Sequence, residues 1–223
     1  GRAVTTIVQL CSALRLTLAT SKSWLWGTTK QSRKELRRIR VDGEPIPVVS
    51  NEIELGADVC YTRQHKRPKL KSRVGLGLTR LVKLAAIPAA AWRKAKIVVQ
   101  GVWTKAMHAA EGTIMPGTTL RKLRTGAARA LGVHRSGANP MLGLASFGHK
   151  RLDPECAEIE AKFMHYRRVF KCFPRLKDPF CNHVTQPTRT MGPAEALRRT
   201  AFRIGWTLRD NGNADIGDGL HVN

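Results

Sequence analysis

The sequence has few acidic side chains, and its middle has almost none. The 223 residues include 39 Lys and Arg but only 16 Asp and Glu, which gives a net charge of +23. Residues 59–151 hold nineteen Lys and Arg and a single acid, Glu111, a net charge of +18. A solvated helical surface normally mixes its signs, and an excess of one sign repels itself in a compact protein. The composition therefore indicates a polyanionic partner, either nucleic acid or an acidic membrane surface.

Long hydrophobic runs and a regular cysteine framework are also missing. No stretch of 18 uninterrupted apolar residues occurs and Arg2 is not followed by a signal-peptide pattern, which argues against a membrane-spanning or secreted protein. The five cysteines are scattered and odd in number, so we expect a reducing compartment, nuclear or cytoplasmic. Because the chain begins at Gly1 and its first methionine is Met107, we expect an internal piece of a longer product.

Sites for common chemistry are missing as well. There is no Gly-x-Ser-x-Gly elbow and no phosphate-binding glycine motif, and the lone acid of the middle segment cannot form a carboxylate pair. Cys172, Cys181 and His183 are the nearest to a zinc site, but zinc ligands usually come in pairs two to four residues apart. The nine-residue step from Cys172 to Cys181 favours free thiols instead.

What is present is enough apolar sequence, 42% of the chain, to bury a core in one large or two small domains. Spacings of three and four residues predict a helix over 2–15 and a short basic helix over 31–40. Between and after them we expect a strand over 22–27, a hairpin around Asp42-Gly43, and a strand over 53–61. No strand pattern of comparable quality follows.

The rest of the chain predicts helices. One covers 76–86, and the next places Trp92 and Trp103 on one inward stripe, although a tryptophan can also stack on a base. Thr118 or Thr119 is expected to cap a helix that ends at Leu131.

Residues 132–152 are expected to form a connection. Asp153-Pro154 begins a helix to about residue 170, a loop with four prolines covers 173–193, and an amphipathic helix covers 193–208. The fold class is therefore α+β and mostly helical.

The densest positive charge lies in residues 63–73, with six cations in eleven residues. Pro68 disfavours a helical conformation at the residue before it, so we expect an extended loop. Such a loop can follow a phosphate backbone without reading sequence. A nuclear-localisation signal is an alternative interpretation of the same run.

Three short motifs follow the first predicted helix in a fixed order. They are Leu-Thr-Leu-Ala-Thr-Ser-Lys-Ser-Trp-Leu-Trp-Gly over 16–27, Val-Asp-Gly-Glu over 41–44, and Glu-Leu-Gly-Ala-Asp over 54–58, followed by a basic helical pair. This order resembles the reverse transcriptases (RNA-directed DNA polymerases) of non-LTR retrotransposons, just downstream of their catalytic Ala-Asp-Asp hairpin. The resemblance covers about residues 3–131.

The resemblance implies a role for each part of the chain. Residues 1–66 would be the end of a polymerase palm, 67–133 a helical thumb, and 134–223 a post-thumb region with a Pro-rich linker. Lys22 would lie near the phosphates of the incoming nucleotide, and Leu55 and Gly56 would form the primer grip. The backbone of the RNA template and DNA primer would be held by Arg63, Lys66, Arg67, Lys69, Lys71, Arg73, Arg93, Lys94 and Lys96.

The sequence departs from this family where catalysis is concerned. The Asp pair that binds two Mg²⁺ ions is not in the sequence, because by the resemblance its hairpin would lie before Gly1. We therefore expect no catalytic residue, no cofactor and no polymerase activity in this chain alone, with Mg²⁺ and the upstream palm and fingers belonging to the parent chain. The residues leave one alternative open, a non-enzymatic basic RNA-binding or ribosome-associated protein.

Overall fold

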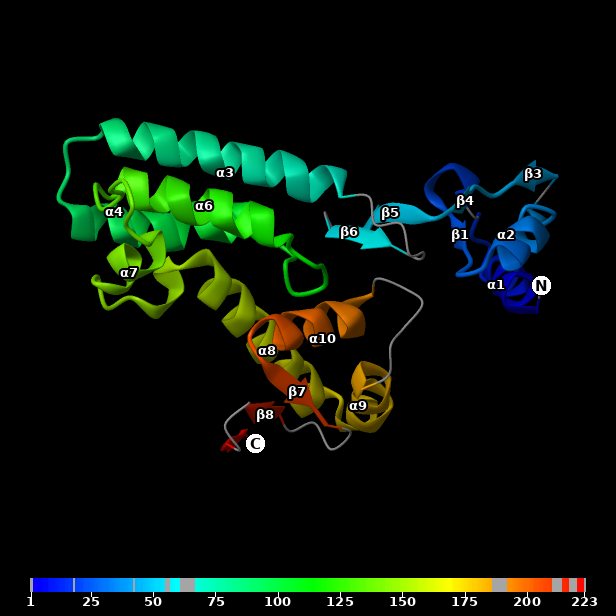
Figure 1. Cartoon of the computed structure of the whole chain (residues 1–223). Helices are drawn as coiled ribbons and strands as arrows, with labels where there is room; N and C mark the ends of the chain where they lie inside the picture. The colour runs from blue at the N-terminus through cyan, green and yellow to red at the C-terminus, as the bar shows by residue number, and fades with distance from the viewer. Residues whose placement is uncertain are drawn as a thin grey trace.

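The computed structural model describes residues 2–17, 19–41, 43–54, 57–60, 67–185, 192–209, 214–216 and 220–222. Within these ranges the chain is mostly helical, with short strands near both ends, which confirms the α+β prediction (Figure 1). The strands form small separate sheets rather than one central sheet. Helices therefore supply most of the packing.

The N-terminal part consists of short elements. Its bounds are α1 (Arg2–Ala13), η1 (Thr20–Lys22), β1 (Leu25–Trp26), α2 (Lys30–Leu36) and β4 (Val48–Val49). Strands β1 and β4 pair in parallel, and Thr29 caps α2 by accepting a hydrogen bond from the Ser32 amide. The predicted helices over 2–15 and 31–40 are confirmed with earlier ends, and the strand over 22–27 shortens to two residues.

Two hairpins follow. Strands β2 (Arg40–Val41) and β3 (Glu44–Pro45) pair antiparallel with Gly43 at φ +81°, which confirms the predicted hairpin. The single strand predicted over 53–61 is wrong, because β5 (Asn51–Glu54) and β6 (Ala57–Cys60) are separate strands that pair antiparallel. Alternating polarity alone does not show where a chain reverses.

The extended loop predicted over 63–73 is also wrong from Pro68 onward. Helix α3 (Pro68–Ala86) begins there, eight residues before the predicted start, with Pro68 in its first turn. Proline fits that turn because its missing N–H would have no partner inside the helix. Asp58 of β6 is buried and accepts hydrogen bonds from the Lys69 amide at 3.2 Å and the Leu70 amide at 2.8 Å. A carboxylate from a neighbouring strand therefore caps α3.

After α3 the chain turns into α4 (Ala91–Ile97), a π-helical segment η2 (Val98–Trp103) and α5 (Thr104–Ala106). Trp103 is buried, and its indole N–H donates to the Leu152 carbonyl, as predicted for a core residue. The prediction for Trp92 is wrong, because this side chain is 53% exposed. The wider π-helical turn changes the helical period between the two tryptophans, so they do not share one face.

Helix α6 (Gly117–Ala130) packs along α3 (Figure 1). Neither predicted threonine caps it, because its N-cap is Pro116. The predicted connection 132–152 contains a short helix, α7 (Pro140–Ala145), and a 3₁₀ turn, η3 (Lys150–Leu152). One apolar core joins α3 through η3 and includes Leu81, Val98, Leu123 and Leu152. The domain boundaries expected from the resemblance stay predictions.

The C-terminal part is built on α8 (Pro154–Cys172), which begins as predicted with Asp153 as its cap. The proline-rich loop prediction is wrong over its first half, because η4 (Pro174–Leu176) and α9 (Lys177–Thr185) are helical. Helix α10 (Pro193–Arg203) ends five residues early. Three strands then form a sheet that the sequence did not indicate: β7 (Trp206–Leu208), β8 (Ala214–Ile216) and β9 (Leu220–Val222).

A buried chain of charges joins α8 and α10. Lys162 and Glu158 have no solvent exposure and pair with each other, and the Lys162 ammonium also donates to the Thr200 hydroxyl at 2.9 Å. Arg203 donates to the second Glu158 oxygen at 2.5 Å, and Glu158 also accepts from the Met115 amide. Burial lowers the pKa of Lys162 in spite of the Glu158 carboxylate. These contacts connect α8, α10 and the segment before α6.

Candidate nucleic-acid interface

The first row of cations lies along one flank of α3. Lys69, Arg73, Arg80 and Lys83 are separated by four, seven and three residues, so the helical repeat places them on the same side. Arg73 donates to the His108 carbonyl and Arg80 to the Gly101 carbonyl, both at 3.2 Å. This flank therefore borders the η2–α5 segment, and its guanidinium groups retain further N–H donors for an anion.

The second row lines a groove between α3 and α6. The groove has a volume of about 770 to 510 Å³ depending on site, and here it is about 510 Å³, with Leu78, Val82 and Ala85 from α3 on its apolar side. Helix α6 contributes three cations, Arg121, Lys122 and Arg129. All three side chains are exposed. An apolar floor beside a row of cations suits a sugar–phosphate backbone, which presents both apolar sugar and charged phosphate.

Close approach of the helices makes this groove narrow. A Cβ on Gly126 would lie 3.0 Å from Leu81 Cδ1, and a Cβ on Gly77 would lie 2.8 Å from the Ala106 Cβ. Glycine at these positions lets α6 and α5 pack tightly against α3. The basic rows are therefore held on one rigid helical body.

Trp92 forms a third feature at the start of α4. Its exposed ring lies 5.1 Å from both the Arg93 guanidinium carbon and the Lys96 ammonium. These are cation–π contacts at an exposed site. Lys94 turns elsewhere and donates to the Ala85 carbonyl at the end of α3. An exposed tryptophan between two cations can stack on a base while the cations meet phosphates.

Hardly any of this charge is neutralised within the protein. Of the Lys and Arg on α3, α4 and α6, Arg124 alone pairs with a carboxylate in the described part of the chain. It contacts Asp153 and Glu155 at the start of α8, and the Asp153 hydrogen bond raises its pKa. The other cations on these helices remain available to an external anion.

The structure brings together some of the sequence-predicted residues and separates others. Lys69 and Arg73 share a flank of α3, whereas Lys71 lies on nearly the opposite side, in line with the α3 residues of the groove. Arg67 is the N-cap residue of α3. Lys22 is exposed in η1, in a separate part of the chain. Leu55, Gly56, Arg63 and Lys66 lie outside the described residues.

Five cations of the interface were missed by the sequence analysis. They are Arg80, Lys83, Arg121, Lys122 and Arg129. A signal was present for α6, since Arg121, Thr125 and Arg129 recur every four residues beside the predicted apolar stripe. The groove itself had no such signal, because it depends on how α3 and α6 pack.

Metal and membrane functions find little in the residues present. No three His, Cys, Asp or Glu side chains gather as a metal site in the described ranges, where Cys172 is exposed and Cys181 is buried. No helix in those ranges has both the length and the hydropathy of a membrane span.

Comparison with protein-family models, with curated proteins and with solved structures finds no match to this chain. The assignment of function therefore rests on the chain's own residues and geometry.

Proposed function

We propose that this chain is the template–primer binding part of a non-LTR retrotransposon reverse transcriptase, with α3, α4 and α6 holding the nucleic-acid backbone. The observation that carries the proposal is the set of cations on these helices with no carboxylate partner in the described residues. The order of motifs over residues 16–58 supports the polymerase family. No catalytic step is assigned to this chain.

The binding mode follows from the kind of groups present. Lysine and arginine contact phosphates without distinguishing bases, so affinity comes from charge neutralisation and counterion release. The apolar floor of the α3–α6 groove fits the sugar edge of a duplex, and the exposed Trp92 fits an unpaired or terminal base. The proposed interface is therefore blind to sequence and sensitive to salt.

The groove cations provide a direct test. Replacing Arg121, Lys122 and Arg129 with Gln removes three positive charges from exposed positions. We expect affinity for an RNA–DNA duplex to fall about 10- to 100-fold, because each lost phosphate contact reduces the salt dependence by about 0.9 in log–log slope. Fluorescence anisotropy with a labelled duplex measures both quantities.

A matched control removes the same charge from another exposed surface. Arg168, Lys171 and Arg175 lie on α8 and η4, away from the groove, so their replacement with Gln should change duplex affinity by less than threefold. Equal losses in the two triple variants would show that net charge alone drives binding and would contradict a specific duplex surface. A preference for one structured RNA over any duplex would favour the alternative, a non-enzymatic RNA-binding protein.

A further inference from the structure

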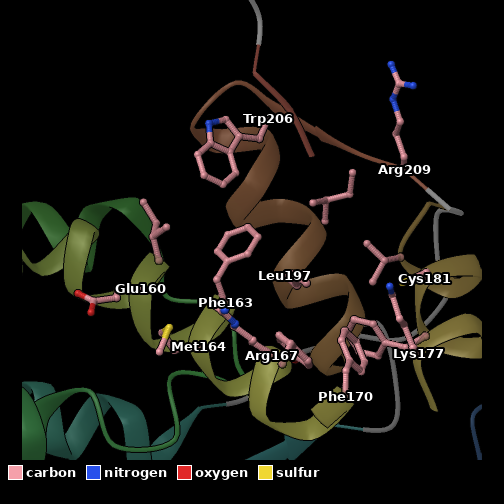
Figure 2. A pocket seen from close by; sticks show the side chains of 15 residues that line it. Glu160, Phe163, Met164, Arg167, Phe170, Lys177, Cys181, Leu197, Trp206 and Arg209 are labelled. Atoms are coloured by element: carbon pink, nitrogen blue, oxygen red, sulfur yellow. The ribbon is translucent and has the colours of Figure 1, made fainter. Parts of the chain in front are cut away.

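A second groove lies in the C-terminal part of the chain, far along the sequence from the α3–α6 groove. It has a volume of about 770 Å³ and is formed by α8, α9, α10 and β7 (Figure 2). This volume is in the range that holds a ligand of nucleotide size or somewhat larger. Five of the chain's thirteen aromatic residues line it: Phe163, Tyr166, Phe170, Phe180 and Trp206.

The aromatic rings form a continuous wall. Phe163 meets Trp206 edge to face with ring centroids 5.3 Å apart, and Phe170 meets Phe180 at the same separation. Tyr166 is buried beneath them, 4.6 Å from Phe180, while the other four rings are partly exposed. Partly exposed rings fixed by their neighbours offer flat faces for stacking at little entropic cost.

Charged side chains stand at the rim of this wall, and their balance is positive. Glu160 is neutralised by Arg151, at 2.6 and 2.9 Å, and Arg209 is neutralised by Asp215 at 2.5 Å. Arg167 and Lys177 are exposed and have no carboxylate partner in the parts of the chain that the structure describes. Figure 2 shows both side chains among the groove-lining residues. Two free cations therefore remain beside the aromatic rings.

We propose that this groove binds unpaired nucleotides of a single-stranded nucleic acid, with bases on Trp206 and Phe163 and phosphates at Arg167 and Lys177. Aromatic faces beside unpaired cations are the combination that single-stranded nucleic acid requires, and stacking tolerates any base. The proposal is independent of the duplex surface, because no residue is shared by the two grooves. The chain then has separate sites for paired and unpaired nucleic acid.

The test compares two double variants of the same chain. In the first, Arg167 and Lys177 become Gln; in the control, Arg168 and Lys171 become Gln. Arg168 and Lys171 are also exposed, and they do not line the groove. With labelled eight-nucleotide oligo(U) and oligo(dT), we expect the first variant to bind about tenfold more weakly and the control to bind like the wild type. The two oligonucleotides distinguish RNA from DNA as the preferred strand.

Duplex binding separates this proposal from the proposed function. The groove variant should retain wild-type affinity for an RNA–DNA duplex, so a failure at one site does not count against the other. Equal weakening by the two double variants, or no weakening by either, would overturn the proposal.

Position is tested by cross-linking, which does not depend on any variant folding correctly. Oligo(U) carrying 5-iodouridine should cross-link to peptides that contain Trp206 or Phe163. Cross-links confined to α3, α4 and α6 would overturn the proposal. So would a dimer in sedimentation velocity that Trp206→Leu dissociates, because the groove would then be an interface between two copies.

Discussion

Helices α3 and α10 are similar in their share of cations but differ in what those cations contact. Helix α3 has five Lys and Arg, and none of them pairs with a carboxylate among the described residues. Helix α10 has three, and Arg198, Arg199 and Arg203 all pair, with Glu195, Glu155 or Glu158. The same residue types therefore serve two purposes, stabilisation in α10 and a surface open to an anion in α3.

This difference shows how to interpret a basic protein. Net charge alone indicates only that an anion is attracted, whereas the position of the few acids shows which cations are already neutralised. Here eight of the nine acids after residue 151 that the structure describes or leaves aside fall outside the middle segment's helices, and Asp153 and Glu155 are the ones that reach back, to Arg124. Charge pairing therefore divides the helices into structural and binding surfaces.

Removing the central carboxylate of the paired region should have the largest effect on stability. Glu158→Ala leaves Lys162 buried without its partner, which we expect to cost about 3–5 kcal/mol of unfolding free energy. The double replacement Glu158→Leu with Lys162→Met should recover most of that loss, because no charge is left buried. Urea denaturation followed by circular dichroism measures both, and a loss below 1 kcal/mol in the single variant would show that the pair is not structurally important.

The unpaired region should instead depend on close packing. Gly77→Ala places a Cβ 2.8 Å from that of Ala106, and we expect overpacking to cost about 1–3 kcal/mol. Gly75→Ala is the control on the same helix, since nothing lies within 4 Å of its new Cβ. It should stabilise α3 by about 0.5–1 kcal/mol through helix propensity. Similar effects of the two substitutions on thermal unfolding would contradict the tight α3–α5 contact.

One acid does reach α3, and it contacts the backbone rather than a cation. Asp58→Ala removes the acceptor for the Lys69 and Leu70 amides, which we expect to cost about 1 kcal/mol. Asp58→Asn keeps one acceptor oxygen and should lose less. Hydrogen exchange should show faster exchange confined to the first turn of α3, and unchanged exchange there would refute the cap.

The smallest expected effect is the pH dependence of Glu195. Its hydrogen bonds with Arg198 and then Arg199 hold the pKa of this carboxyl below its ordinary value of 4.5. A lowered pKa in the folded protein contributes stability above pH 4.5, and that contribution is lost as the pH falls through the folded value.

The comparison that isolates this carboxyl is wild type against Glu195→Gln. We expect wild type to be more stable by less than about 1 kcal/mol at pH 7, because both arginines are partly exposed, with the difference vanishing near about pH 3. A stability difference that is constant over this pH range would contradict the ion pairs as its source.

The sequence predicted elements whose signals are local. The Asp42-Gly43 hairpin and the Asp153-Pro154 start of α8 were both correct, because turn and capping residues act on their immediate neighbours. The fold class was correct for the same reason, since amphipathic spacing is frequent along the chain.

What failed depended on tertiary context. Pro68 could end an extended segment or begin a helix, and the cap from Asp58 that favours the helix comes from another element. Trp92 left the predicted apolar stripe because η2 changes the helical period before Trp103. Of the candidate site, the cations of α3 and α4 could be predicted from composition, but the α3–α6 groove could not.

The salt dependence of duplex binding by the full chain tests the account most directly. A surface of unpaired cations on α3, α4 and α6 predicts a loss of about 10³ or more in affinity between 50 and 200 mM salt, with little preference among duplex sequences. Anisotropy titrations of two unrelated RNA–DNA duplexes at four salt concentrations supply the measurement. A flat salt dependence, or strong binding to one sequence alone, would contradict the assignment of these helices as a duplex-binding surface.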